Sequence, residues 1–340
     1  MSPRPPISSE RGLAIILVIF IVSLMTILVV NLAYSTTLSS RLNAMAVRSV
    51  QAEYILKSAL NLARRLLMEE RPQQEQLPNP WEMFVNSAPI PSELLGINEP
   101  NVRVELEIRP EDSKIRIDQL VQGSSADRWA EALYNLFQHL GFSDDQEEDQ
   151  SGLFPKRVFK SEEMVGNLID FIDPDKESFQ GSAFAHGIES ELREGEFPNE
   201  RLASINELKN VPGFTPNRLK KMFPYVTTRG KYKVNINSAP PEVLKALHRE
   251  IDDNLVQRIL DRRKEGPFKR PGWVTEYRDI VGEEIFNATY NMVDVESNWY
   301  QVIAKVDYGG NSRYFLRAVV FQEGTGLNAQ LPRINSLELF

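Results

Sequence analysis

The 340-residue sequence has no cysteine and only three histidines, His139, His186 and His248. The absence of cysteine excludes disulfides, thiolate zinc sites and cysteine nucleophiles. The histidines are too far apart in the chain for metal-ligand spacing. The G-x-S-x-G, H-E-x-x-H and glycine-rich phosphate-binding motifs are absent as well. The sequence therefore predicts a protein that is not an enzyme.

Basic residues are fewer than acidic ones, with 39 Lys and Arg against 47 Asp and Glu and a net charge of −8. That balance argues against a surface built to wrap nucleic acid. The hydrophobic content of 42% and charged content of 25% are ordinary for globular proteins and exclude disorder throughout. The length predicts two or three domains, or one domain with a large insertion.

Charged residues are missing from positions 13–33, an uncharged run of 21 residues. As a helix this run is about 31 Å long, which matches the hydrocarbon core of a bilayer. Arg4 and Arg11 precede it, so the positive-inside rule leaves the short leader in the cytoplasm and sends the rest outward. A plain signal anchor is the alternative interpretation. A cleaved secretory signal is disfavoured because the run is long and no A-x-A site follows.

Glycine and proline, which break helices, are missing from Leu13 to Arg71. Beyond the apolar run, hydrophobic residues recur at steps of three and four as far as Leu67. This predicts one helix of nearly sixty residues, about 85–90 Å long. The alternative is a membrane anchor followed by a coiled-coil stalk, but a strict heptad is not sustained.

The residues before the apolar run are Ser9-Glu10-Arg11-Gly12. A charged leader that ends in glycine directly before an apolar segment resembles the type III leader of type IV pilins and secretion pseudopilins. The resemblance implies that a prepilin peptidase cuts between Gly12 and Leu13 on the cytoplasmic face and that the new N-terminus is methylated.

The rest of the chain predicts a small sheet interrupted by helices. Residues 102–108 alternate as a half-buried strand, with 114–117 as its expected hairpin partner. Residues 300–306 and 313–321 predict a second strand pair. Helical segments are expected at 126–140, 161–172, 204–210, 215–222 and 241–264, and the acidic run 143–149 is expected to be a solvated loop.

Seven stretches in this order resemble the minor pseudopilin K family of the type II secretion system, general secretion pathway protein K. They are residues 11–14 (RGLA), 114–120 (KIRIDQL), 168–175 (LIDFIDPD), 202–213 (LASINELKNVPG), 234–244 (VNINSAPPEVL), 313–320 and 332–339. The resemblance implies an α+β fold: a long N-terminal transmembrane helix, a pilin-like antiparallel sheet, and a large SAM or helix-hairpin-helix-like domain inserted in that sheet. The expected division is a leader at 1–12, the helix at 13–71, the sheet domain at 72–119 and 297–340, and the inserted domain at 120–296.

The same resemblance implies a minor pseudopilin at the tip of the pseudopilus, acting in protein export across the outer membrane. Its implied partners are the minor pseudopilins I and J and the prepilin peptidase. The implied location is the inner membrane, with a single pass and the C-terminal domain in the periplasm.

Position 17 is a further point of resemblance. Most pilins carry a glutamate at the fifth residue of the mature chain, where it neutralises the terminal amine of the adjacent subunit in an apolar environment. Counting from Leu13, that position is Leu17. The K family also lacks this glutamate, which suits a subunit with no neighbour above it.

Acidic residues alternate around Pro174, and a second acidic group follows at 189–191. Alternating carboxylates in a loop suit Ca²⁺, which takes six to eight oxygen ligands, although EF-hand spacing is absent. The stretch resembles the acidic motif of the K family, in which calcium binding is known. The implied ligands are Asp173, Asp175, Glu189 and Glu191, with Ser190 standing where the family has Asp. Solvated acids at the end of a helix are the alternative.

Residues 205–280 hold 16 Lys and Arg against 9 Asp and Glu, a local charge of +7. Residues 211–219 and 235–239 look like helix-hairpin-helix elements, which in DNA-binding proteins offer backbone amides to phosphate. A membrane-anchored, competence-type DNA-binding protein is therefore the alternative function. The second hairpin, 247–254, has no glycine, which hinders close approach to phosphate, so a protein-docking role is preferred over nucleic acid.

Overall fold

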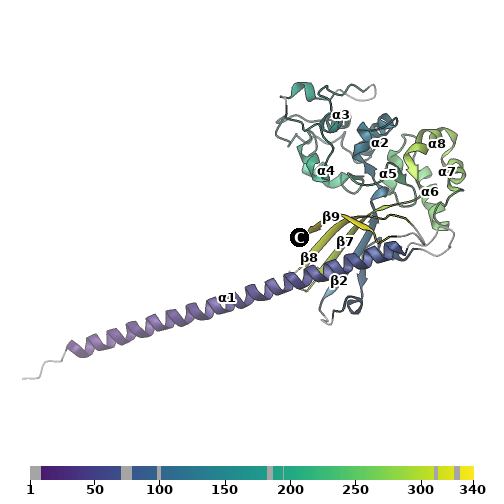
Figure 1. The fold of residues 1–340 in the computed structure, drawn as a ribbon. Helices are drawn as coiled ribbons and strands as arrows, with labels where there is room; N and C mark the ends of the chain where they lie inside the picture. The colour runs from purple at the N-terminus through teal and green to yellow at the C-terminus, as the bar shows by residue number, and fades with distance from the viewer. Residues whose placement is uncertain are drawn as a thin grey trace, which may run out of the picture.

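The computed structural model describes residues 9–69, 79–97, 101–181, 187–193, 195–309, 313–324 and 330–340. It consists of one long helix, a five-stranded sheet packed on the end of that helix, and a helical insertion on the far side of the sheet (Figure 1). The two apolar cores are separate, one between helix and sheet and one inside the insertion.

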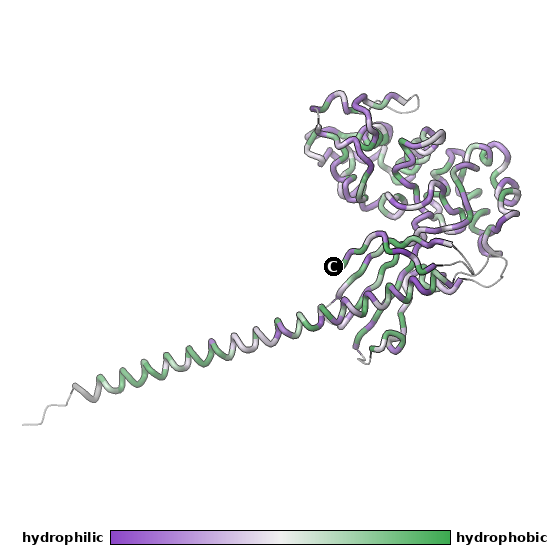
Figure 2. Tube along the Cα trace, viewed as in Figure 1, coloured by the Kyte–Doolittle hydropathy of each residue, from purple (hydrophilic) through white to green (hydrophobic). Residues whose placement is uncertain are grey.

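Helix α1 (Ser9–Met68) confirms the expected single long helix. Residues 13–51 are exposed along the whole circumference, and the far end of the helix is strongly hydrophobic (Figure 2). From Ala52 onward one stripe becomes buried, at Ala52, Leu56, Ala59, Leu60, Ala63 and Leu67. This three- and four-residue spacing places the stripe on one helix face, which packs on strands of the sheet.

The sheet has the strand order β1-β2-β7-β8-β9, and all its neighbours are antiparallel. The strands are β1 (Ala88–Ile90), β2 (Arg103–Pro110), β7 (Trp299–Asp307), β8 (Arg313–Phe321) and β9 (Arg333–Leu339). Short 3₁₀ turns, η1 (Pro80–Phe84) and η2 (Ser92–Leu95), flank β1. Alternate residues of β2, β7 and β8 are buried under α1 because strand side chains alternate between faces. The predicted strands at 102–108, 300–306 and 313–321 are therefore confirmed.

The expected hairpin between 102–108 and 114–117 is wrong. Strand β3 (Ile115–Arg116) pairs in parallel with β4 (Val226–Thr227), and β2 has β1 and β7 as neighbours. The 3₁₀ turn η3 (Glu111–Ser113) follows Pro110 directly and leads the chain out of the sheet. Ile115 and Ile117 are then fully buried in the core of the helical insertion, so hydrophobic burial there determines the pairing.

The helical insertion leaves the sheet after Pro110 and returns at Trp299. Its helices are α2 (Ala126–His139), α3 (Ser161–Ile172), α4 (Pro216–Met222), α5 (Pro241–Ala246), α6 (Asp253–Glu265), α7 (Trp273–Val281) and α8 (Glu283–Thr289). Short 3₁₀ turns connect them at η4 (Ile117–Val121), η5 (Glu189–Glu191), η6 (Ile205–Asn210) and η7 (Tyr290–Met292), and β5 (Val234–Asn235) pairs in parallel with β6 (Val293–Asp294).

Two helical expectations need correction. The segment 204–210 is a 3₁₀ turn, and 241–264 is two helices rather than one. The break has a local cause. Ile251 is buried, and the Asp252 side chain accepts a hydrogen bond from the Leu255 N–H at 2.8 Å, which caps the start of α6.

Asp112 joins the sheet to the helical insertion. Its side chain is only 2% exposed and accepts backbone N–H groups from Lys231 (2.5 Å), Asn298 (2.7 Å) and Trp299 (3.0 Å). Burial nevertheless raises the pKa of this carboxyl. One side chain thus connects the outgoing chain, the returning chain and a turn within the insertion.

Candidate metal centre

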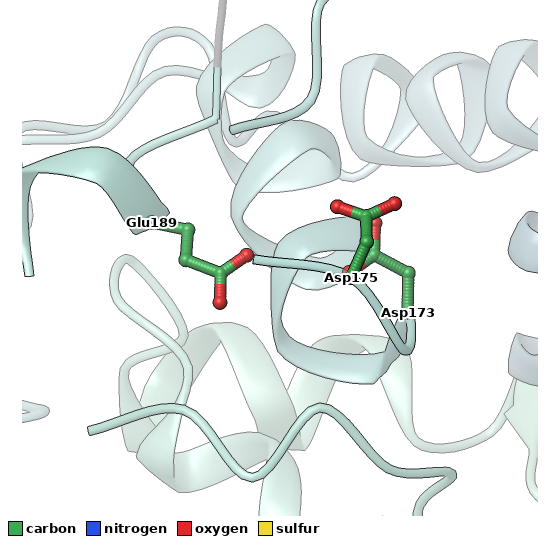
Figure 3. A group of neighbouring side chains, drawn as sticks. All are labelled: Asp173, Asp175 and Glu189. Carbon is green, nitrogen blue, oxygen red and sulfur yellow. The ribbon is translucent and has the colours of Figure 1, made fainter. Parts of the chain in front are cut away.

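Three acidic side chains converge at the end of α3. Asp173 caps the helix, Asp175 follows two residues later, and Glu189 opens η5. One oxygen from each lies within 4.8 Å of the others, and Figure 3 shows the three side chains facing the same space. The expected ligands Asp173, Asp175 and Glu189 are therefore close together although two segments supply them.

Asp170 positions these two segments. Its buried carboxylate accepts the Phe179 N–H at 2.6 Å and the Glu189 N–H at 2.9 Å. Gly187 lies so near that an added Cβ would be 2.1 Å from Asp170 Oδ2, so the approach requires glycine. The last turn of α3 thereby holds η5 in place.

Several oxygens around the cluster have no donor. Asp173 Oδ1, Glu189 Oε2 and Asn199 Oδ1 are buried without a hydrogen-bond partner in the described part of the chain. The Asn199 amide donates to the Asp175 carbonyl oxygen (2.5 Å) and to Glu189 Oε1 (2.7 Å). Unpaired buried acceptors are costly, and a cation that prefers oxygen ligands would satisfy them. These oxygen ligands therefore fit calcium.

The electrostatics point the same way. Burial, followed by the negative charges of Asp175, Asp170 and Glu189, raises the pKa of Asp173 from 3.8 to about 7. Burial also raises the pKa of Asp170. The cluster thus concentrates negative charge that a divalent cation would balance.

The structure does not bring Glu191 into this cluster. Its carboxylate forms an ion pair with Arg157 at 3.1 Å, and the same guanidinium binds Glu163 at 3.1 Å. Ser190 accepts a hydrogen bond from the Ser178 hydroxyl at 2.8 Å. Sequence spacing missed Asn199, which lies ten residues beyond Glu189 and carries no motif of its own. Its left-handed backbone, with φ of 51°, is a tertiary feature.

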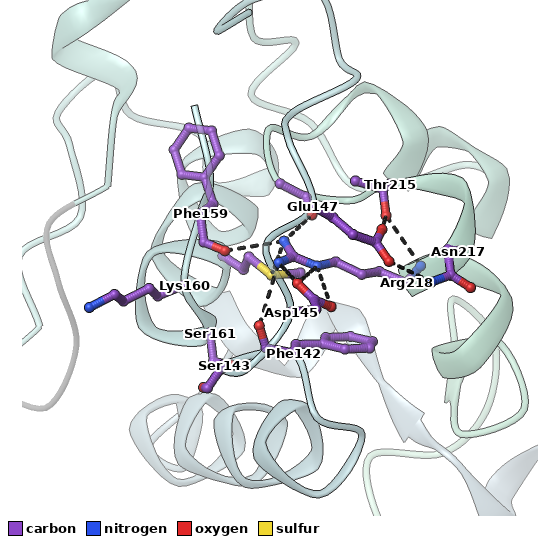
Figure 4. A network of polar contacts seen from close by, with 12 residues as sticks. Phe142, Ser143, Asp145, Glu147, Phe159, Lys160, Ser161, Thr215, Asn217 and Arg218 are labelled. Carbon is purple, nitrogen blue, oxygen red and sulfur yellow. Dashed lines mark hydrogen bonds and ion pairs between the residues drawn. The ribbon is translucent and has the colours of Figure 1, made fainter. Parts of the chain in front are cut away.

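The acidic run 143–149 is not a solvated loop, and that expectation is wrong. Arg218 is fully buried and pairs with Asp145, while Glu147 accepts from the side chains of Thr215 and Asn217 (Figure 4). Asp149 accepts the Gly213 N–H at 2.8 Å. Each of these three carboxylates thus accepts a hydrogen bond from a buried residue, namely Arg218, Thr215 or Gly213.

This network also bears on the DNA-binding alternative. In the candidate hairpin 211–219, the Gly213 N–H is bonded to Asp149 and the Arg218 side chain is 0% exposed. Neither group is available to a phosphate. The basic residue and the glycine amide that favoured a helix-hairpin-helix function serve the internal packing of the insertion.

The expected processing site lies near the start of α1, at Gly12 and Leu13. Leu17 is 57% exposed within the apolar span. This helix is long and apolar enough to cross a bilayer, with a mean hydropathy of 3.3 in its most apolar window, and is compatible with single-pass anchoring.

Residues 234–289 match the family model of type II secretion system protein K. A solved structure with the same fold is the GspK-GspI-GspJ complex of enterotoxigenic Escherichia coli, with a TM-score of 0.62 and 18% identity. The match covers 88% of this chain and 99% of that one. The stretch 234–289, within the helical insertion, is therefore similar to protein K of the type II secretion system.

A search of curated protein sequences finds no match. The expected α+β fold is confirmed, and the match at residues 234–289 supports the expected resemblance to the minor pseudopilin K family. The competence-type alternative has no support in either match. The family model covers β5 to α8 within the helical insertion, and the fold match extends to the sheet and helix.

Proposed function

We propose that this chain is a minor pseudopilin of the protein K family, forms the tip of the type II pseudopilus and docks on minor pseudopilins I and J. The observation that carries this proposal is the helical insertion, which lies beside a pilin-like sheet at the end of a bare apolar helix (Figure 1). In a filament packed through N-terminal helices, such bulk has room only at an end. The similar fold is that of a chain in a GspK-GspI-GspJ complex, which supports the choice of partners.

The docking surface would include α1 and the edge strand β9. Register places Ile334, Leu337 and Leu339 opposite Val320, Ala318 and Leu316, on the face that α1 covers elsewhere. These three β9 side chains stay more than 40% exposed. Together with the exposed part of α1, residues 13–51, they offer apolar surface to the helix of a neighbouring subunit.

The orientation in the membrane follows from the leader. Arg4 and Arg11 precede the apolar span, so the leader would stay in the cytoplasm. The sheet and the helical insertion would then lie in the periplasm, as a single-pass protein of the inner membrane.

Immunogold labelling tests the tip assignment, and Leu17→Glu makes the test sharper. Inserting a carboxylate into the membrane costs about 2.5–3.5 kcal/mol at a helix centre and less near the end of the span, so the variant should insert. At the tip no neighbouring subunit places its terminal amine beside position 17, so the substitution should not improve assembly. We expect unchanged or lower secretion and label at one end of the pseudopilus, with Leu17→Gln as the uncharged control. Label along the filament for either the parent or Leu17→Glu contradicts the tip assignment.

Cleavage between Gly12 and Leu13 is a separate expectation. Mass spectrometry of protein extracted from membranes with an active prepilin peptidase should give a methylated chain that begins at Leu13. Gly12→Val should retain the leader because a branched side chain replaces the small residue at the cut. Loss of that leader in Gly12→Val, or an intact Met1 in the parent chain, contradicts the processing proposal.

We also propose that Asp173, Asp175, Glu189 and the Asn199 side-chain oxygen hold a calcium ion. The ion would supply positive charge to carboxylates that burial and mutual repulsion leave poorly compensated. The residues of the chain do the rest: Asp170 orients η5, and Asn199 ties Glu189 to the Asp175 backbone. The cation would thereby lock the end of α3 to η5.

Calcium is expected to raise the unfolding temperature of the full chain in detergent, because a ligand that binds only the folded state stabilises it by about 2.7 kcal/mol at a hundredfold excess over Kd. Asp173→Ala combined with Asp175→Ala should abolish the gain, and Glu191→Gln should preserve it. The raised pKa of Asp173 makes the calcium-free protein lose stability as pH rises towards about 7. The calcium gain should therefore be larger above that pH than below it. A gain that survives the double substitution rules out this site.

A further inference from the structure

A cleft of about 1500 Å³ separates the helical insertion from the sheet. Its sheet wall includes Arg109, Ile303 and Arg317, which alternate with the residues buried under α1. Its other wall includes Lys220 and Arg263 of the insertion. The volume exceeds the about 300–1,000 Å³ of typical small-molecule pockets, so a polypeptide segment fits it better than a metabolite.

The cleft is basic in an acidic protein. Eight Lys and Arg and five Glu line it, a balance of +3, whereas the whole chain carries −8. A net positive lining around a hollow raises the local electrostatic potential and attracts ligands of negative charge. The cleft therefore favours an acidic ligand.

Arg263, near the end of α6, gives the cleft a specific anchor. Its Nη1 donates to the Ala239 carbonyl oxygen at 2.8 Å. Its Nε and Nη2 are buried without a partner in the described residues, and so is the hydroxyl of Ser238, which precedes Ala239. Burial lowers the pKa of Arg263 to about 10, and no carboxylate opposes that shift.

This arrangement differs from that of the fully buried Arg218. Arg218 pairs with Asp145 and donates to the carbonyl oxygens of Phe159 and Gly213. Among the described residues Arg263 has no acidic partner, and a guanidinium cannot shed its charge at physiological pH. The edge that it leaves unpaired, Nε with Nη2, is the one that binds a carboxylate through two parallel hydrogen bonds.

We propose that the cleft binds an acidic polypeptide segment, one carboxylate of which pairs with the Nε–Nη2 edge of Arg263 while the Ser238 hydroxyl donates to the same group. Arg263 is only partly buried as a residue and lines the cleft, and in the proposed complex its side chain would rotate to turn that edge towards the ligand. The assignment is independent of the tip position and of calcium.

Fluorescence anisotropy with the full chain in detergent tests this site, with a labelled octaglutamate as probe and octaglutamine as the uncharged comparison. We expect octaglutamate to bind and octaglutamine not to bind. Arg263→Met should weaken the binding of octaglutamate by about tenfold or more, since hydrogen bonds to a charged group are lost. Arg263→Lys should bind more tightly than Arg263→Met, because lysine keeps the positive charge but lacks the two parallel N–H donors of the guanidinium.

Arg249→Met is the matched control, because Arg249 is exposed and does not line the cleft. Equal weakening by Arg249→Met and Arg263→Met would show general charge attraction and overturn the proposal. Binding of citrate without binding of octaglutamate would overturn the choice of a polypeptide. Without peptide, Arg263→Met should leave the unfolding temperature unchanged or higher, since it removes an uncompensated charge. A lower unfolding temperature would assign Arg263 a structural role instead.

Discussion

Arg218→Met is expected to cost about 3–5 kcal/mol of folding free energy, which is enough to unfold many domains. The guanidinium is fully buried, pairs with Asp145, and donates to the carbonyl oxygens of Phe159 and Gly213. Methionine fills similar space but removes the donor from the Asp145 carboxylate and from both carbonyl oxygens, of which only that of Gly213 keeps another donor among the described residues, the Thr215 N–H. The loss should appear in urea unfolding of the full chain in detergent, followed by tryptophan fluorescence.

Two variants separate this effect from a general loss of positive charge. Arg249→Met, on the exposed turn between α5 and α6, should change stability by less than about 0.5 kcal/mol. Adding Asp145→Asn to Arg218→Met should recover part of the loss, because the uncompensated charge is removed as well. If Arg218→Met and Arg249→Met unfold at the same urea concentration, the buried network does not stabilise the fold as argued.

Asp112→Ala is expected to cost about 3 kcal/mol, because three partly buried backbone N–H groups lose their acceptor and each unpaired group costs about 1–3 kcal/mol when buried. The three donors belong to Lys231, Asn298 and Trp299, so the loss also loosens the helical insertion from the sheet. Limited proteolysis should then cut at the junction near 111–114 or 296–299 faster than elsewhere, and urea unfolding should report the energy.

Asp112→Asn is the conservative comparison. It keeps one acceptor oxygen of the same shape, so its cost should be smaller than that of Asp112→Ala. Equal protease resistance of the parent and Asp112→Ala would show that the junction is held by other contacts.

Local patterns predicted the parts of the fold whose cause is local. The uninterrupted helix from Leu13 to Leu67 and the strands at 300–306 and 313–321 follow from spacing and from the absence of breakers. Helix 161–172 was predicted with the bounds that the structure gives. In each case, the pattern that decides the element lies within the element itself.

The rest depended on partners far away in the chain. Ile115 has the pattern of a hairpin strand, but its pairing is decided by Val226 and by the core of the helical insertion. The acidic run 143–149 has the composition of a solvated loop, and only the position of Arg218, some seventy residues later, gives it a structural role. Asn199 joins the metal centre for the same reason, because a single amide in a loop carries no local signal.

The unbroken helix α1 also sets a mechanical property. Between Leu13 and Gln51 no described residue covers it, and this stretch is about 58 Å long, of which about 31 Å is the apolar span. With that span placed in a bilayer, the first packed turn would lie about 27 Å beyond the hydrocarbon edge. Sharp bends in helices arise mainly at proline and glycine, which this stretch lacks. The exposed part of α1 is therefore a stiff helix of fixed length. A displacement of its N-terminal end along the helix axis moves the sheet and the helical insertion through the same distance.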